Sequence, residues 1–278
     1  MIRDALAHAA LALESTSSSA RLDAELLLAH ALGIDRARLR VLAEDALAPA
    51  AAARFDALCA QRAAGAPVAY LVGKRDFWSL TLAVDPAVLV PRPETELLVE
   101  LALSHLAGRP APAVLDLGTG SGAIGLAIAS ERPDAQVDLV DLSPAALRVA
   151  ERNRATLGLA NARCLAGSWF EPIGDRRYDL IVANPPYLGD GDPHLAAPDL
   201  RHEPRLALVS GPDGLEMLSA IAAQAPDHLV PGGRLALEHG AQQGAAVRAL
   251  LAGAGFAAIA TQRDLAGLER ATYGARGG

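Results

Sequence analysis

Residues 113–122 read Ala-Val-Leu-Asp-Leu-Gly-Thr-Gly-Ser-Gly, and this stretch decides the fold. Its apolar first half, Ala113–Leu117, predicts a buried strand, and a helix is predicted to open at Ala123. Three glycines stand between them, at positions 118, 120 and 122. Because glycine has no Cβ, such a turn bends sharply and lets its backbone approach a ligand closely. The stretch is typical of a strand–turn–helix unit that binds a nucleotide-type cofactor.

The same alternation of strands and helices runs from about residue 91 to the end of the chain. The clearest predicted helix is Pro144–Leu157, with Ser143 as its N-cap and Gly158 past its end. The predicted strands are Ala113–Leu117, Val137–Val140, Ala162–Leu165, Tyr178–Ala183 and Arg234–Leu237, with weaker ones at Phe256–Ala260 and Arg270–Tyr273. This order predicts an α/β fold with a mostly parallel sheet, whose ligands bind beyond the carboxyl ends of the strands.

The residues before this region predict a separate small domain. Residues 1–72 form short helical patterns without a strand; Ser19 is the expected cap of the second helix, Gly33 its stop, and Pro49 opens a later helix. Residues 73–90 carry near-alternating apolar positions and are expected to form a β-hairpin linker. The domains are therefore predicted as 1–72, 73–90 and 91–278.

Composition excludes several classes of protein. Of the 278 residues, 51% are hydrophobic, which supports a packed core and excludes disorder. No uncharged apolar run is long enough to span a membrane. The two cysteines, Cys59 and Cys164, form no metal-type pair, so no metal site is expected and a reducing cytoplasm fits. The net charge of −7 argues against a nucleic-acid footprint, although the 24 arginines among the 25 basic residues leave a local basic face open.

Asp141 ends the second predicted strand of this region, 25 residues after Asp116. A carboxylate at that point can accept hydrogen bonds from the two hydroxyls of a ribose. It can also stand there only because the following helix favours an acid in its first turn. Since Gly120, Gly122 and Gly125 also satisfy the dinucleotide pattern G-x-G-x-x-G, a nicotinamide enzyme remains a rival at this point.

The segment Asn184-Pro185-Pro186-Tyr187 separates these cofactors, because it follows the apolar strand Tyr178–Ala183 directly. A planar NH2 group is a poor nucleophile until its nitrogen becomes pyramidal. The Asn184 side-chain oxygen and the Pro185 carbonyl can accept its two N–H bonds, and Tyr187 can stack on the flat group. Positioning of this kind can supply up to ~7–11 kcal/mol of the barrier. The order of motifs therefore predicts a methyltransferase that acts on a planar nitrogen.

The chain resembles the HemK-type peptide chain release factor glutamine methyltransferases along nearly its full length. The resemblance rests on Pro-Arg-Pro-Glu-Thr-Glu at 91–96, the glycine stretch 116–122, Asn-Pro-Pro-Tyr at 184–187 and Leu-Glu-His-Gly at 237–240. The segment from Asp192 to Pro204 is similar to the loop that follows the catalytic motif in that family. The N-terminal domain matches only in general character.

The resemblance implies a Rossmann-like class I S-adenosylmethionine-dependent methyltransferase with an N-terminal helical domain for substrate recognition. It implies methylation of the N5 amide of the glutamine in the Gly-Gly-Gln motif of class 1 release factors. Release factors would be the protein partner of a cytoplasmic monomer that needs neither nucleic acid nor membrane. The residues implied to contact the cofactor are Gly118, Thr119, Gly120, Ser121, Gly122, Asp141, Trp169 and Asn184, and those implied to hold the substrate and carry catalysis are Asn184, Pro185, Pro186 and Tyr187.

Some residues near these motifs keep two interpretations. Trp169 can cover an adenine or belong to the core, and His239 is expected to be structural rather than a proton acceptor. His194 and His202 either bind substrate or lie on a solvated surface, and the resemblance places Arg92 and Glu94 near the cofactor.

Three other functions compete with this hypothesis. An adenine-N6 DNA or guanine-N2 RNA methyltransferase can hold a flipped base with the same tetrapeptide, but the acidic charge argues against it. A cofactor-sensing module without catalysis would not need Asn184. A nicotinamide dehydrogenase would be stabilised by NAD rather than by S-adenosylhomocysteine.

Overall fold

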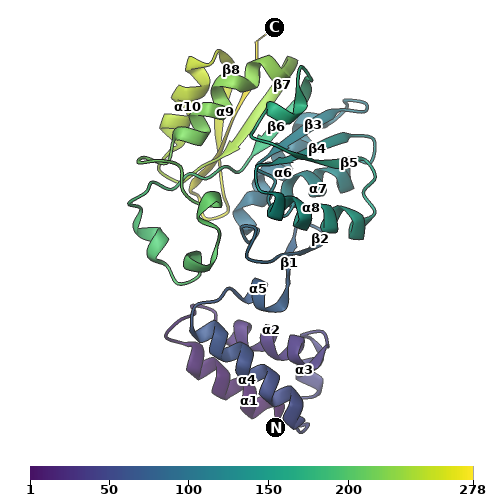
Figure 1. The fold of residues 1–278 in the computed structure, drawn as a ribbon, viewed down its shortest axis with the longest axis vertical. Helices are drawn as coiled ribbons and strands as arrows, with labels where there is room; N and C mark the ends of the chain where they lie inside the picture. Colours follow the sequence, from purple (N-terminus) through teal and green to yellow (C-terminus); the bar gives the residue numbers. More distant parts are fainter. Residues whose placement is uncertain (278) are drawn as a thin grey trace. The chain divides into compact units, whose positions relative to one another are not determined.

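The computed structural model describes residues 1–277, in which the chain forms two units (Figure 1). One unit contains Met1–Lys74 and, from much later in the sequence, Pro193–His202. The other begins at Arg75, runs to Asp192, and resumes at Glu203. The sequence analysis places residues 193–202 in the methyltransferase domain, and nothing in their composition indicates that they group with the N-terminal helices.

The first unit is helical, as predicted. Its helices are α1 (Ile2–Leu13), α2 (Ala20–Leu32), α3 (Arg38–Val41), α4 (Pro49–Ala63) and α5 (Val68–Val72), and its later segment adds the 3-10 turns η3 (Pro193–Ala196) and η4 (Leu200–His202). The core is built mainly of leucines and alanines around Phe55. Gly33 ends α2 in the left-handed conformation, as expected. The predicted side-chain cap at Ser19 is wrong, because its hydroxyl turns to the carboxylate of Asp23 at 3.1 Å instead of to the helix backbone.

A short hairpin opens the second unit. Its strands β1 (Lys74–Phe77) and β2 (Leu80–Ala83) form a two-stranded sheet. Leu80 and Leu82 face the interior together with Phe77, while the residue between the two leucines is exposed. The hairpin predicted from the alternating apolar residues is therefore present in the structure.

A seven-stranded sheet forms the centre of the second unit, in the order β5-β4-β3-β6-β7-β9-β8. The strands are β3 (Ala113–Leu117), β4 (Gln136–Asp141), β5 (Ala162–Ala166), β6 (Tyr178–Ala183), β7 (Leu229–Glu238), β8 (Phe256–Arg263) and β9 (Glu269–Arg276). Among the described strands, β9 runs antiparallel to both of its neighbours, β7 and β8, and the other neighbouring pairs of this sheet are parallel. After β5 the chain returns to place β6 beside β3, so the strand order reverses there, and ligands bind at such a reversal in open α/β sheets.

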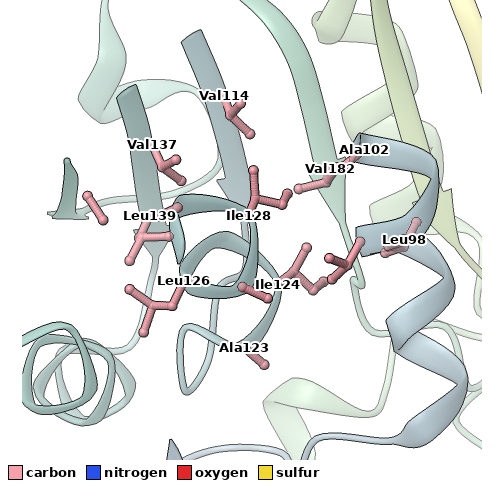
Figure 2. Packing of buried hydrophobic residues seen from close by; sticks show 14 of the residues in the cluster. Leu98, Ala102, Val114, Ala123, Ile124, Leu126, Ile128, Val137, Leu139 and Val182 are labelled. Atoms are coloured by element: carbon pink, nitrogen blue, oxygen red, sulfur yellow. The ribbon is translucent and has the colours of Figure 1, made fainter. Parts of the chain in front are cut away.

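Helices cover both faces of this sheet. They are α6 (Glu96–Leu106), α7 (Ala123–Glu131), α8 (Pro144–Leu157), α9 (Glu216–Gln224) and α10 (Gly244–Gly253), with 3-10 turns η1 (Pro93–Thr95), η2 (Glu171–Ile173), η5 (Arg205–Ala207) and η6 (Ala225–His228). Alternate residues of each strand point to opposite faces. Val114 therefore joins the core with α6 and α7 that Figure 2 shows, while Leu115 joins the core with α9 and α10.

The two faces account for the near-continuous apolar character of the central strands. Strands buried on both sides lose the polar–apolar alternation of a half-exposed sheet. In Figure 2, Ile124 and Ile128 of α7 lie among side chains of the sheet and of α6. Among the described residues, no helix is long and apolar enough to cross a membrane.

Candidate active site

A cavity of about 290 Å³ lies at the carboxyl ends of the parallel strands of the second unit. The loop after β3 lines it with Gly118–Ser121, and the loop after β4 with Asp141–Ser143. The loop after β5 adds Trp169, and the loop after β6 adds Asn184. Residues dispersed over the sequence thus meet where the strand order reverses, as the sequence analysis predicts.

The glycine loop has the conformation that its sequence requires. Gly118 and Gly120 have φ of +68° and +56°, which L side chains rarely adopt. A Cβ on Gly118 would lie 3.5 Å from the ring of Trp169, so a larger residue would extend into the cavity. Gly122, which was implied to contact the cofactor, does not line the cavity. A Cβ there would meet Leu126 at 2.6 Å, so this glycine permits close packing where α7 begins.

Asp116, at the end of β3, fixes the glycine loop through hydrogen bonds. One carboxylate oxygen, Oδ2, accepts from the Thr119 hydroxyl at 2.6 Å and from the Gly125 N–H at 3.0 Å. The other oxygen, Oδ1, is buried and has no partner among the described residues. Burial raises the pKa of Asp116 to about 6, although both hydrogen bonds oppose that rise. Asp116 is not among the described residues that line the cavity, so it supports the glycine loop rather than facing the cavity.

Asp141 is held as a pre-oriented acceptor at the cavity wall. Its Oδ2 accepts from the Gly120 N–H and its Oδ1 from the Ser143 N–H, both at 2.8 Å. Each carboxylate oxygen can accept a second hydrogen bond, so the ribose role predicted for Asp141 is compatible with both contacts. Burial raises its pKa, and the two N–H donors oppose that rise. The residue therefore also ties the glycine loop to the end of β4.

Trp169 adds an aromatic wall. It lines the cavity with φ of +46°, an uncommon conformation for a bulky residue. Leu142 and Ile124 contribute apolar surface to the same cavity. Apolar walls with a few fixed polar groups are usual for a site that takes a flat heterocycle.

Residues before α6 close another side. Glu203 accepts from the Val90 N–H at 3.0 Å and pairs with Arg92, which lines the cavity. Glu203 itself is buried, so it holds the segment that carries Arg92 in place. Glu94, which was expected near the cofactor together with Arg92, is not among the described residues that line the cavity.

The Asn-Pro-Pro-Tyr motif is only partly in the cavity. Asn184 and Pro186 line it, whereas Pro185 and Tyr187 are not among the described residues that do. The Tyr187 hydroxyl lies 3.5 Å from Oε1 of Glu238, and burial raises the pKa of Tyr187. The stacking role of Tyr187 therefore stays a prediction, and in this structure its hydroxyl is directed at the end of β7.

Among known proteins, two family models match the chain. The one described as "PrmC N-terminal domain" matches residues 4–73, and the one described as "Methyltransferase small domain" matches residues 94–201. A release factor glutamine methyltransferase of Xylella fastidiosa is 54% identical over 265 residues, which are 95% of this chain and 96% of that protein. The Escherichia coli protein of the same name is 45% identical and covers 93% of each chain. The chain belongs to the release factor glutamine methyltransferase family.

Solved structures of other methyltransferases share the fold. A methyltransferase from Pyrococcus furiosus superposes with a TM-score of 0.55 at 19% identity, covering 72% of this family member and 90% of that chain. A 16S rRNA N2 G1207 methyltransferase from Thermus thermophilus, solved with AdoMet and guanosine, superposes with a TM-score of 0.55 at 23% identity. The match covers 73% of this chain and 49% of that chain. At these identities the likeness concerns the class I methyltransferase fold alone, which confirms the predicted fold class.

The cavity of this family member fits S-adenosylmethionine. The cofactor carries an ammonium group, a sulfonium centre and a ribose diol, which all favour acceptors over cations. Asp141 offers a fixed carboxylate at the cavity wall. The Gly118 position leaves room that a Cβ would take, and Trp169 supplies a flat apolar face.

Two residues with a place in this site were missed from the sequence. Thr95 lines the cavity, and its Oγ1 accepts from Nδ2 of Asn184 at 3.2 Å. Glu238 lies buried behind it at the end of β7. Both residues lie in segments on which the family resemblance rests. A threonine or a glutamate alone does not indicate a role in a site, because that role depends on which side chains lie beside it in the folded protein.

The three histidines fall outside the cavity lining among the described residues. His239 is fully buried, and its ring nitrogens lie 2.8 Å from Oγ1 of Thr272 and 2.9 Å from the Gly240 carbonyl, as a structural residue would. His194 and His202 belong to the segment that groups with the helical unit. Nε2 of His202 lies 3.4 Å from the Ala64 carbonyl.

Proposed function

We propose that this chain transfers a methyl group from S-adenosylmethionine to the N5 side-chain amide of the glutamine in the Gly-Gly-Gln motif of class 1 peptide chain release factors. The printed names of relatives that are 45–54% identical support this reaction. The observation that carries the proposal is the position of Asn184. Its side-chain amide lines the same cavity as the glycine loop and Asp141.

The cofactor's site is formed by residues of the second unit. Gly118–Ser121 would hold its amino-acid part, Asp141 its ribose and Trp169 its adenine. Bound there, S-adenosylmethionine supplies a methyl group activated by its sulfonium centre. The apolar walls of the cavity exclude water from the reacting atoms, which strengthens every electrostatic contact inside.

Asn184 prepares the substrate nitrogen. A glutamine side-chain nitrogen shares its lone pair with its carbonyl, so it attacks poorly while it stays planar. The Asn184 Oδ1 and the Pro185 carbonyl would each accept one of its N–H bonds. These contacts strengthen as the nitrogen becomes tetrahedral and positive, so they lower the barrier rather than merely increase binding. Attack of the nitrogen lone pair on the methyl carbon would form an N–C bond as the C–S bond breaks, with S-adenosylhomocysteine as the leaving group. The methylated nitrogen would then release one proton to solvent water, which restores a neutral amide.

The pocket and the protein substrate fit one another sterically. Pro185 and Pro186 fix the backbone beside the entrance, so a glutamine packed within a helix or strand could not enter. Glycines flanking the glutamine add no side-chain bulk and tolerate unusual dihedral angles. We assign the helical unit to docking of the release factor away from this loop, which raises the effective concentration of the glutamine. The enzyme would act as a monomer in the cytoplasm, without nucleic acid or membrane.

A methyl-transfer assay tests the reaction. Purified enzyme and labelled S-adenosylmethionine are incubated with an intact release factor, with the same factor carrying asparagine in place of the Gly-Gly-Gln glutamine, and with bulk DNA and RNA. Label is expected only on the intact factor. Label on adenine or guanine with none on the factor would overturn the proposal.

Two further comparisons test the assigned roles. Asn184→Ala is expected to lose nearly all turnover while S-adenosylhomocysteine affinity changes far less, because the lost contact belongs to the transition state. A Gly-Gly-Gln peptide is expected to be methylated far more poorly than the whole factor. Equal kcat/KM on peptide and factor would refute the docking role of the helical unit.

A further inference from the structure

The backbone of the Asn-Pro-Pro-Tyr motif has few anchors of its own. The motif follows β6 directly, and its prolines, Pro185 and Pro186, have no N–H group to donate. Within residues 1–277, residues 185–187 form no hydrogen bond with another backbone group. The proposed reaction nevertheless needs the Pro185 carbonyl at a fixed place beside the substrate nitrogen. A side chain from elsewhere in the sequence therefore has to hold this segment.

The side-chain amide of Gln243 is the anchor that the structure provides. Its Nε2 donates to the carbonyl of Tyr187 at 3.0 Å. Its Oε1 accepts from the N–H of Gly240 at 2.9 Å. Gln243 directly precedes α10, and Gly240 lies two residues after the end of β7. One side chain thus ties the end of the motif to the loop that follows the neighbouring strand.

The two backbone partners also fix the orientation of this amide. A backbone N–H only donates a hydrogen bond, and a backbone carbonyl only accepts one. A reversed Gln243 amide would set its NH2 group against the N–H of Gly240 and its oxygen against the carbonyl of Tyr187. The orientation with Nε2 toward the motif is therefore the one that satisfies both partners.

Two glycines leave the space that this contact needs. Gly214 has φ of +76°, and a Cβ on it would lie 2.1 Å from the carbonyl oxygen of Tyr187. A Cβ on Gly240 would lie 3.1 Å from Oε1 of Gln243. Nε2 of Gln243 also lies 3.5 Å from the carbonyls of Asp213 and Gly214. The backbone is packed so closely around the Tyr187 carbonyl that a larger residue at position 214 would displace it.

We propose that Gln243 is a positioning residue for methyl transfer, which holds the Tyr187 carbonyl and thereby sets the direction of the Pro185 carbonyl. The inference rests on the proposed role of Pro185 as an acceptor for the substrate nitrogen. At the other end of the motif, Thr95 accepts from Nδ2 of Asn184 at 3.2 Å. Only two prolines lie between these two held residues, and each ring fixes its φ near −65°. With both ends held, the segment between them has little freedom to turn its carbonyl away from the substrate.

A loss of this anchor should affect the chemical step more than cofactor binding. A misplacement of a reacting or positioning group by about 1 Å can cost on the order of 10²-fold in rate. The hydrogen bonds of the Gln243 side chain go to residues 187, 213, 214 and 240. None of these belongs to the loops after β3 and β4, which are proposed to hold the cofactor.

The test measures kcat, KM and S-adenosylhomocysteine affinity of Gln243→Glu in the full-length enzyme, with an intact release factor as substrate. Glutamate keeps an acceptor for Gly240 but places a carboxylate oxygen against the Tyr187 carbonyl. We expect kcat to fall at least tenfold, with KM and S-adenosylhomocysteine affinity within threefold of wild type. Gln243→Met, which has a similar length and no N–H donor, should lose kcat as well. Gln242→Glu makes the same chemical change at the exposed neighbouring position and should match wild type.

The pH dependence of Gln243→Glu distinguishes positioning from a loss of packing. A protonated carboxyl can donate a hydrogen bond to the Tyr187 carbonyl, as the amide does. The ratio of variant kcat to wild-type kcat should therefore rise as the pH falls toward the ordinary glutamate pKa of about 4.3. The same ratio for Gln243→Met, which has no group to protonate, should stay constant. A constant ratio for both variants would contradict the role of the donated hydrogen bond.

Wild type supplies a measurement that does not depend on the folding of any variant. In nitrogen-edited proton NMR spectra, the Nε2 protons of Gln243 should exchange with solvent at least tenfold more slowly than those of the exposed Gln242. Equal exchange rates, or a kcat of Gln243→Glu within twofold of wild type, would overturn the positioning role while leaving the proposed reaction intact. Failure of wild type to methylate the release factor would instead overturn the proposed function, and with it the reaction that Gln243 is proposed to serve.

Discussion

Arg62 and Asp199 are 137 residues apart in the sequence, yet Nη1 of the arginine lies 2.6 Å from Oδ1 of the aspartate. The same guanidinium binds Asp23 of α2 through Nε at 2.7 Å. Arg62 is 5% exposed and Asp23 6% exposed. One buried cation therefore joins α2, α4 and the late segment 193–202 within the helical unit.

Replacing this arginine should destabilise the helical unit. Arg62→Ala leaves the buried Asp23 carboxylate without its cation, and breaking a buried pair in this way costs about 3–5 kcal/mol. Hydrogen exchange of the α2 and α4 amides measures the stability of this unit alone. Arg3→Ala is the control, because its pair with Glu44 is exposed on both sides and should cost about 1 kcal/mol or less. Equal loss of protection in the two variants would contradict the buried role of Arg62.

Asp141 should contribute to cofactor affinity in two ways. Asp141→Ala removes the acceptor for the ribose and releases the N–H of Gly120 from the carboxylate. The loss of two hydrogen bonds to a charged acceptor predicts a cost on the order of 2–4 kcal/mol. Titration calorimetry with S-adenosylhomocysteine measures it, with the exposed Asp175→Ala as control. Affinity within threefold of wild type would remove Asp141 from the cofactor site.

Two helical glycines should respond oppositely to alanine. A Cβ on Gly125 would lie 2.1 Å from Cδ2 of the buried Leu139 and 3.0 Å from Oδ2 of Asp116. Gly125→Ala is therefore expected to cost about 1–3 kcal/mol through overpacking. Gly253, at the end of α10, has nothing within 4 Å of its Cβ position, so Gly253→Ala should be neutral or gain up to about 1 kcal/mol. The urea midpoints of unfolding of the two variants, measured in the same buffer, test this difference in stability. Equal midpoints would refute the close packing beneath the glycine loop.

The stability of the protein should depend on pH through Glu238. Burial raises the pKa of this carboxyl from 4.5 to about 7. The folded protein therefore retains a proton that the unfolded chain has released in this range. The stabilisation that the protonated Glu238 contributes to the folded protein is complete below pH 4.5 and is lost as the pH rises through about 7.

The measurement is the difference in unfolding free energy between wild type and Glu238→Gln at several pH values. The variant does not titrate at this position. Its unfolding free energy should therefore rise relative to that of wild type by on the order of 3 kcal/mol between pH 4.5 and a pH above 7. Asp116 titrates in both proteins and cancels from the difference. A difference that is constant over this range would show that Glu238 is already ionised in the folded protein at low pH.

Local chemistry explains what could be predicted from the sequence. The glycines of 118–122 and the apolar run of β3 each report on a few adjacent residues, so strand, turn and helix follow from the chain itself. Asp141 and Asn184 could be placed in one site because parallel strands end at the same edge of a sheet. The capping of α8 by Ser143 is equally local, and its Oγ accepts from the Ala146 N–H at 3.2 Å.

The features that were missed depend on partners far away in the sequence. Thr95 meets Asn184 across 89 residues, and no periodicity encodes that contact. Ser19 is a local exception: it has the residue type of a helix cap, but Asp23, four residues later, takes its hydroxyl. Tyr187 has the residue type of a stacking platform, and only the tertiary structure shows that its hydroxyl reaches Glu238.

The grouping of residues 193–202 with the N-terminal helices makes the helical unit discontinuous along the chain. A cut after Lys74 would separate most of that unit from its last ten residues, Pro193–His202, which would stay attached to the rest of the chain. Asp199 would then lose its ion pair with Arg62. Chimaeras that exchange helical units between relatives therefore need three junctions instead of one. Evolution faces the same constraint, because a substitution at Arg62 must be tolerated by a segment encoded more than a hundred codons downstream.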